Sequence, residues 1–172
     1  MSRLNNQKIS LATVLIAMGV VHAPFLWFYV FGSKAFPGQH MVNAIAGVLL
    51  GPFWAAFIAF CIGVVRMALC IGTIFSLPGG IPGGVVVGLF AWILNRTIGK
   101  HQEIAALTEP IGTIFIGATI AVYFVAPQQG LKWSLIPIWI GWSFSTIPGA
   151  IAGFLILETL KLTGFTREIF NK

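Results

Sequence analysis

The chain has 172 residues, of which 58% are hydrophobic and only 8% are charged. Soluble domains carry about a quarter charged residues, so this composition excludes a soluble fold and predicts an integral membrane protein. The net charge of +6 comes mostly from basic residues at the ends of apolar segments. That placement favours orientation in a bilayer over nucleic-acid binding.

The hydropathy pattern predicts an all-α protein, a single domain over residues 1–172 with six transmembrane helices. The expected helices cover residues 9–21, 39–50, 53–69, 81–98, 109–125 and 135–157. The first resembles a signal peptide, but Pro24 disfavours cleavage, so we expect it to be retained. Residues 24–31 are aromatic and leave two interpretations open, a continuation of the first helix or a loop across the outer surface. Residues 72–82 are predicted to form an uncharged Gly/Pro loop, and residues 95–108 are predicted to form a polar segment outside the bilayer.

The basic residues fall unevenly on the two sides of this topology. Seven are expected on one side: Arg3, Lys8, Arg96, Lys100, Lys161, Arg167 and Lys172. Only Lys34 and Lys132 are expected on the other. The positive-inside rule therefore predicts that both termini are cytoplasmic, in a multi-pass protein of a prokaryotic cell membrane.

Small residues recur at intervals of three or four along three of the expected helices. The sets are Gly80, Gly84 and Gly88; Thr113, Gly117 and Ala121; and Ser143, Thr146, Ala150 and Gly153. Such stripes allow helix backbones to approach closely in lipid. They favour packing within a compact bundle over contacts with a partner.

Polar and aromatic side chains collect at one expected depth, in the outer half of the bundle. The candidate binding residues are Gln39, His40, Asn43, Arg66, Tyr123, Trp139, Trp142 and Ser143. The candidate gating-loop residues are Lys34, Phe36, Ser76, Pro78 and Gly79. Intramembrane ionisable groups mark functional sites, so this convergence predicts a binding pocket that opens outward.

Each of these residues also has a purely structural interpretation. Arg66 could extend to the interface, His40 could bond to backbone at a helix start, and Asn43 could bridge helices. The tryptophans and Tyr123 could be interfacial anchors, and Lys34 a solvated charge. The hypothesis rests on their shared depth.

The same reading places no carboxylate in the outer half, because Glu109 and Glu158 are expected at cytoplasmic helix ends. The expected ligand is therefore small, neutral or weakly anionic, and ring-containing, with aromatic side chains stacking on it. The sequence contains no nucleotide-binding P-loop, no metal-ligand cluster and no Ser-His-acid set. We therefore expect a protein that is not an enzyme, has no cofactor or metal of its own, and depends on a partner for energy.

One stretch carries a specific resemblance. It begins Lys34-Ala35-Phe36-Pro37-Gly38-Gln39-His40-Met41-Val42-Asn43, continues with Leu49-Leu50-Gly51-Pro52, and is followed by Arg66 and the Pro78-Gly79 segment. With these features the chain resembles the ThiW type of substrate-binding S component of energy-coupling-factor (ECF) vitamin transporters.

The resemblance implies a high-affinity binding subunit, open to the outside, for the thiamin precursor hydroxyethylthiazole. It also implies docking on an ECF module, a transmembrane T subunit with two ATPases that hydrolyse the ATP. One departure concerns the Ala-x-x-x-Ala pattern of helix 1, because Ala12 is followed by Ile16 and the nearest small pair is Thr13 and Ala17. The alternatives are an S component for another vitamin, such as pantothenate or thiamin, and a non-transporting membrane scaffold whose polar residues bond to one another.

Overall fold

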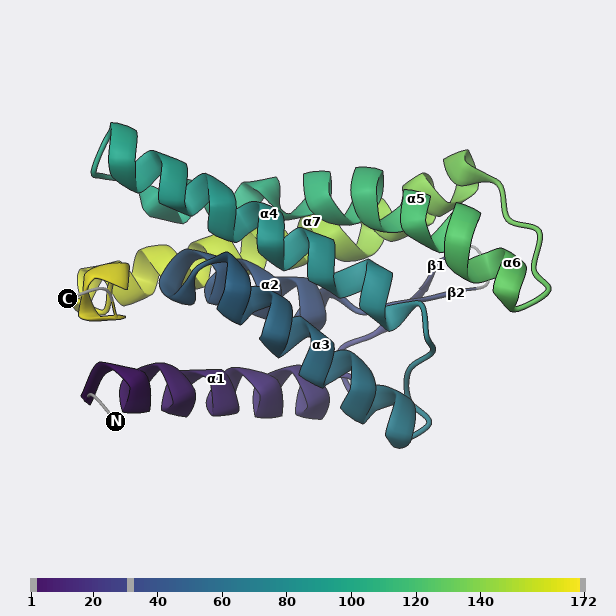
Figure 1. Ribbon diagram of the computed structural model, residues 1–172, viewed down its shortest axis with the longest axis horizontal. Coiled ribbons are helices and arrows are strands. Elements are labelled where there is room, and N and C mark those ends of the chain that lie inside the picture. Colours follow the sequence, from purple (N-terminus) through teal and green to yellow (C-terminus); the bar gives the residue numbers. More distant parts are fainter. Residues whose placement is uncertain (1–2, 31–32, 171–172) are drawn as a thin grey trace.

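The computed structural model describes residues 3–30 and 33–170. Its first half consists of α1 (Arg3–His22), an antiparallel hairpin of β1 (Phe28–Val30) and β2 (Ser33–Ala35), α2 (Pro37–Leu50), α3 (Pro52–Ala68) and α4 (Ser76–Thr97). Both ends of the described chain lie at one end of the bundle, together with residues 98–101 (Figure 1). We call this the terminal end, and the opposite end, with the β1–β2 hairpin and residues 129–134, the hairpin end.

The second half contains two long helical segments. Residues 102–128 form one continuous helix that mixes 3-10, π and α turns, here called the 102–128 helix. Its parts are η1 (Gln102–Thr108), η2 (Ile111–Gly117), α5 (Ala118–Ile120), η3 (Ala121–Val125) and α6 (Ala126–Gln128). Helix α7 (Leu135–Leu162) returns to the terminal end, where η4 (Arg167–Phe170) closes the described chain.

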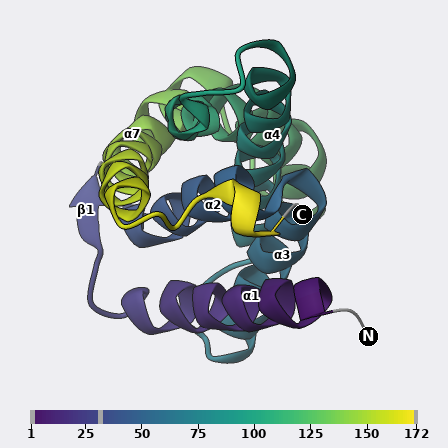
Figure 2. The same cartoon turned by 90° about the vertical axis from the view of Figure 1, so that its left-hand side faces the viewer.

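Helix α2 lies at the centre of the bundle (Figure 2). It contacts α1, α3, α4, α7 and η1, and every residue of it except Pro37 and Met41 is buried. Gly51, with a positive φ of 89°, turns the chain directly from α2 into α3. Because the other helices surround α2, its side chains face protein on all sides.

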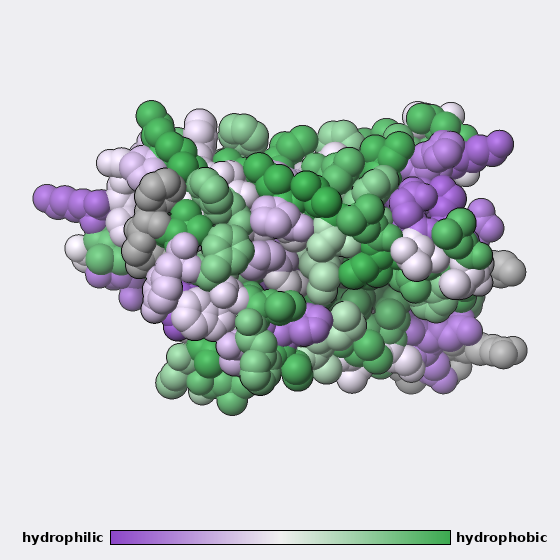
Figure 3. Space-filling view, turned by 180° about the vertical axis from the view of Figure 1, so that it is seen from behind, coloured by the Kyte–Doolittle hydropathy of each residue, from purple (hydrophilic) through white to green (hydrophobic). Residues whose placement is uncertain are grey.

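Four helices of the described chain are long and apolar enough to cross a membrane: Leu4–His22, Ser76–Thr97, Gln102–Gln128 and Leu135–Leu162. Helix α3 is a shorter apolar helix, and the 14 residues of α2 span about 21 Å, less than a hydrocarbon core of about 30 Å. Hydrophilic residues gather mainly at the two ends, with hydrophobic side chains between them (Figure 3). The helical membrane protein expected from composition is confirmed, with four helices of spanning length.

Residues 24–30 do not continue the first helix, so that interpretation is wrong, and they form a turn followed by a short strand. Pro24 has no amide hydrogen to donate, and α1 ends at His22. The chain then forms strand β1, in which Tyr29 pairs with Lys34 of β2. The Lys34 ammonium lies 4.3 Å from the centre of the Trp27 ring, a cation–π contact across the hairpin.

The segment 76–82, expected to be a loop, is instead the first part of α4. Proline and glycine disfavour helix in water, but a membrane helix accepts them where contacts with neighbouring helices compensate. The Ser76 and Gly80 carbonyls accept hydrogen bonds from Gln39 and Asn43 of α2. Packing against α2 thus overrides the local propensity.

The 102–128 helix also begins earlier than the expected position 109. Gln102 donates to Asn95 at 2.7 Å, and Glu103 forms an ion pair with Lys161 at 3.0 Å. These contacts bury two polar residues that the hydropathy pattern placed outside the bilayer. Residues 102–108 of the expected polar segment are therefore helical, and their position outside the bilayer stays a prediction.

The small-residue stripes are confirmed as internal packing surfaces. A Cβ atom added to Gly88 would lie 2.5 Å from the Pro52 Cα atom, and one added to Gly84 would lie 3.1 Å from the Ala55 Cβ atom. Gly153 packs in the same way against Ala44 of α2. The small residues thus set the close spacing of α2, α3, α4 and α7.

Candidate functional site

A buried polar cluster forms where the first turns of α2 and α4 meet the 102–128 helix. Gln39, His40 and Asn43 are 6%, 7% and 0% exposed, and their spacing of three or four residues places them on adjoining faces of α2. The structure thus brings together the three polar residues that the sequence singled out on this helix.

Glu109 is the residue at the centre of this cluster, and it is fully buried. Its Oε1 atom accepts hydrogen bonds from His40 Nδ1 at 2.7 Å, Thr113 Oγ1 at 2.8 Å and Asn43 Nδ2 at 3.3 Å. The expectation of a carboxylate-free group of polar residues is therefore wrong. Because the helix begins at Gln102 with a 3-10 segment, Glu109 lies about 14 Å inside it instead of at its end.

Arg66 joins the cluster from the last turn of α3. It is only 2% exposed, so it does not extend to an interface. Its Nη1 atom donates to Gln39 Oε1, and its guanidinium lies 4.2 Å from the centre of the Phe36 ring. The guanidinium is thus held by one amide and one aromatic face, and Phe36 closes the cluster toward the hairpin.

The start of α4 contributes backbone carbonyls to the same cluster. Gln39 Nε2 donates to the Ser76 carbonyl at 3.3 Å and Asn43 Nδ2 to the Gly80 carbonyl at 3.0 Å. The Thr113 hydroxyl, which donates to Glu109, lies 3.4 Å from the Gly79 carbonyl. A side chain at Gly80 would collide with the Gln39 amide, and one at Gly83 with Glu109 and Thr113. Glycine is required here because the polar side chains lie directly against the α4 backbone.

Several buried polar atoms around the cluster have no hydrogen-bond partner among the described residues. They are Asn43 Oδ1, Arg66 Nε, Glu109 Oε2, Trp139 Nε1 and Thr146 Oγ1. Buried polar groups are nearly always paired, and each exception requires an explanation. The cluster therefore has unused hydrogen-bonding capacity of both kinds, donors and acceptors.

A comparison with protein families decides which kind of protein contains this cluster. The family model of the thiamine-precursor transporter protein (ThiW) matches residues 9–163. The chain belongs to the ThiW family. It is a multi-pass membrane transporter for a thiamine precursor, and not an enzyme. Searches of curated proteins and of solved structures found no match.

In this ThiW protein, α7 supplies the aromatic wall beside the cluster. Trp142 is half-buried, and its ring lies within 4 Å of positions where a Cβ atom on Gly79 or Gly117 would be. Trp139 packs edge-on against Phe115, with ring centres 5.2 Å apart. Gly149, two turns after Trp142 along α7, packs against His40. Thr146 lies between Trp142 and Gly149 on the same face of α7, so it also faces the cluster.

Two other predicted ThiW site residues lie differently. Tyr123 is 61% exposed and is not brought to the cluster. The Ser143 hydroxyl donates to the Ile140 carbonyl of its own helix at 2.6 Å. Among the predicted gating residues, Phe36 touches Arg66, Lys34 contacts Trp27, and Ser76, Pro78 and Gly79 are helical. Whether any of them binds substrate stays a prediction.

Sequence reasoning missed four polar residues in or beside the cluster: Glu109, Thr113, Ser145 and Thr146. Ser145 Oγ accepts the Phe36 backbone amide hydrogen at 2.7 Å and so fixes the chain that enters α2. Thr113 and Thr146 lie on the small-residue stripes, which the sequence did reveal as buried faces. A hydroxyl on such a buried face was the signal in the sequence that could have identified Thr113 and Thr146.

Two of the cavities in the described chain lie away from the cluster. One, of about 230 Å³, lies at the terminal end between the start of the 102–128 helix and η4. The other, of about 340 Å³, is an apolar groove between α4 and the far part of the 102–128 helix. Pro78 is the one predicted site residue that lines either of them.

Proposed function

We propose that this chain is the substrate-binding S component of an ECF-type importer and binds hydroxyethylthiazole from the extracellular side. The observation that carries the proposal is the buried cluster of Gln39, His40, Asn43 and Arg66 in a thiamine-precursor transporter. The cluster has unpaired donors in Arg66 and Trp139, which suit the ring nitrogen of a thiazole. The half-buried ring of Trp142 beside it suits a flat aromatic ligand.

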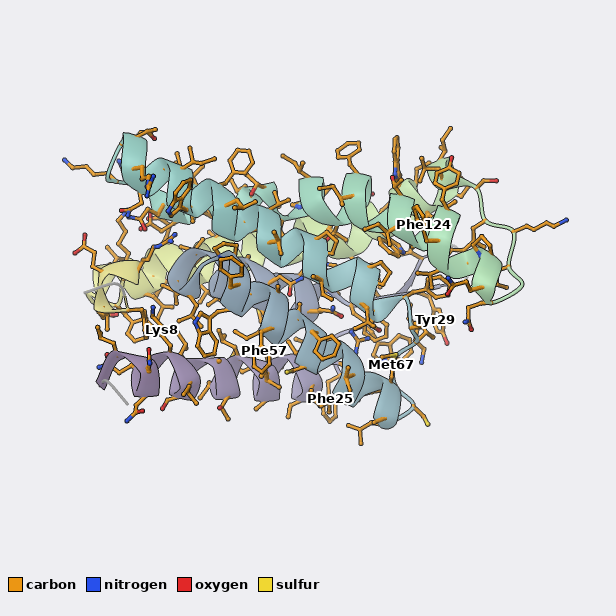
Figure 4. The ribbon with its side chains drawn as sticks, viewed as in Figure 1. Lys8, Phe25, Tyr29, Phe57, Met67 and Phe124 are labelled. Atoms are coloured by element: carbon orange, nitrogen blue, oxygen red, sulfur yellow. The ribbon has the colours of Figure 1, made fainter. Side chains whose placement is uncertain are left out.

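The proposed topology has six membrane segments and cytoplasmic termini. Lys8 lies at the terminal end, whereas Tyr29 and Phe124 lie at the hairpin end (Figure 4). The segments with Arg96, Lys100, Lys161 and Arg167 also lie at the terminal end (Figure 1). This asymmetry supports a cytoplasmic terminal end and a binding site reached from the hairpin end.

The proposed energy source is an ECF module whose ATPase subunits hydrolyse ATP, since this chain has no P-loop. Helix α1 offers a face for the T subunit. It packs into the bundle through Ala12, Leu15 and Gly19, and leaves the small pair Thr13 and Ala17 exposed. The pair nearest in spacing to the family pattern therefore lies on the free side of α1.

Two alternatives retain a specific observation in their favour. The buried Glu109 carboxylate removes the charge argument against a cationic ligand, so thiamin itself stays a candidate. The cluster residues also bond to one another, as a scaffold protein would require. Arg66 could in turn pair with the carboxylate of pantothenate.

Ligand binding to the purified full chain in detergent tests the proposal. We expect saturable binding of hydroxyethylthiazole, weakened about 5- to 150-fold in His40→Ala and Asn43→Ala, because each loses a buried polar contact worth about 1–3 kcal/mol. Tight binding of pantothenate or thiamin, with no binding of hydroxyethylthiazole, would indicate that this chain is an S component for the vitamin it binds. Binding of none of the three would favour the scaffold.

A further inference from the structure

The two oxygen atoms of the Glu109 carboxyl group have opposite surroundings. Oε1 accepts three hydrogen bonds, from His40, Thr113 and Asn43. Oε2 is buried and has no partner among the described residues, and the same holds for Oδ1 of Asn43. A buried oxygen left unpaired costs about 1–3 kcal/mol, more when it is charged.

The contacts on Oε1 fix the direction in which Oε2 points. Glu109 lies against the Gly83 backbone, where a Cβ atom would come within 2.9 Å of the Glu109 Cδ atom. With three donors on one oxygen and a backbone against the carboxyl group, the side chain has little freedom to rotate and pair Oε2 elsewhere. The Asn43 amide is held in the same way, since its Nδ2 donates to Gly80 and Glu109.

Both unpaired atoms are acceptors, so the group that completes them is a hydrogen-bond donor. Asn43 Nδ2 and Glu109 Oε1 are 3.3 Å apart, so the two unpaired oxygens belong to side chains that are hydrogen-bonded to each other. A hydroxyl or ring N–H of a small molecule can donate to one of these oxygens and an ammonium to both, whereas a ligand with acceptors alone can donate to neither.

We propose that Glu109, together with Asn43, is the subsite that recognises the donor group of the transported thiamine precursor. For hydroxyethylthiazole this group is the alcohol O–H, which donates to Glu109 Oε2. The inference rests on the proposed function and adds its specificity determinant. In this proposal the carboxylate selects ligands that carry a hydroxyl, and Arg66 and the aromatic side chains of α7 contact the thiazole ring.

Three ligands and two variants test the assignment in the purified full chain. The probes are hydroxyethylthiazole, its O-methyl ether, which keeps the oxygen but cannot donate, and the corresponding ethylthiazole. We expect the wild type to bind the alcohol about 10- to 100-fold more tightly than the other two, since a hydrogen bond to a charged acceptor carries that discrimination. In Glu109→Gln the preference should fall to a few-fold. Glu103→Gln, at the terminal end and paired with Lys161, should keep it.

The outcomes separate this inference from the function on which it rests. Equal wild-type affinity for the alcohol and its ether would overturn the donor subsite, as would a preference that survives Glu109→Gln, and Oε2 would then be the site of an internal water. Failure of the wild type to bind any of the three would overturn the proposed function itself. If Glu109→Gln is not monodisperse, Glu109→Asp, which keeps the charge but withdraws it by one methylene, replaces it with the same expectation.

Discussion

At the scale of single residues, Thr113 shows how tightly the cluster is tied together. Its hydroxyl donates to Glu109 and lies near the Gly79 carbonyl, in a fully buried position. Thr119 on the same helix is a matched comparison, because its hydroxyl donates to the Phe115 carbonyl of its own helix. Both threonines thus have a satisfied hydroxyl, but only that of Thr113 connects different parts of the bundle.

We expect Thr113→Val to lower the free energy of unfolding by about 1–3 kcal/mol, because Glu109 then loses a buried donor. Thr119→Val should change stability by less than about 0.5 kcal/mol. Thermal unfolding of both variants in the same detergent measures the difference. Equal effects would mean that the Thr113 contact is not a stabilising one.

The sequence revealed the polar residues of α2 and Arg66, because a polar side chain inside an apolar segment is visible in any hydropathy profile. It could not reveal Glu109. The depth of that carboxylate depends on where its helix begins, and this start is set by Asn95 and Lys161, which bond to Gln102 and Glu103. A hydropathy profile cannot detect these contacts, because they join residues that lie apart in the sequence.

At the scale of elements, the glycine faces of α4 determine how close its neighbours come. Gly88 lies against the Pro52 backbone, where a Cβ atom has no flexible side chain to displace. Gly141 of α7 has nothing within 4 Å of such an atom. The two glycines are therefore a matched pair, each in a helix, one packed and one free.

We expect Gly88→Ala to destabilise the protein by about 1–3 kcal/mol through overpacking. Gly141→Ala should leave stability unchanged or raise it by up to about 1 kcal/mol, since alanine favours helix. Unfolding temperatures in detergent distinguish the two. A neutral Gly88→Ala would contradict the close packing of α4 on the α2–α3 turn.

The six helices of the sequence prediction all exist, but some of their ends differ where side chains from other elements hydrogen-bond to the helix backbone. The start of α4 at Ser76 is the clearest case, because its carbonyls are used by Gln39 and Asn43. The β1–β2 hairpin was not foreseen, since the aromatic run before it has no alternation that distinguishes a strand.

At the scale of the whole molecule, the proposed orientation in the membrane rests on the distribution of charge and can be measured directly. We expect a cysteine at Lys132, in the hairpin-end connection, to react with an impermeant maleimide added outside intact cells. A cysteine at Lys100, in the terminal-end connection, should react only after the membrane is opened. A background with Cys61 and Cys70 replaced removes labelling of the native thiols. The reverse pattern would invert the proposed topology and the side from which substrate enters.

The burial of α2 also bears on how the surrounding membrane influences the protein. The helix that carries Gln39, His40 and Asn43 is enclosed by α1, α3, α4, α7 and η1, so protein and not lipid surrounds these three proposed binding side chains. Membrane thickness and headgroup type act on the outer helices and through them on stability. Substrate affinity should therefore be nearly the same in a detergent micelle and in bilayers of different lipids, so a cell could change its membrane composition without retuning this binding step.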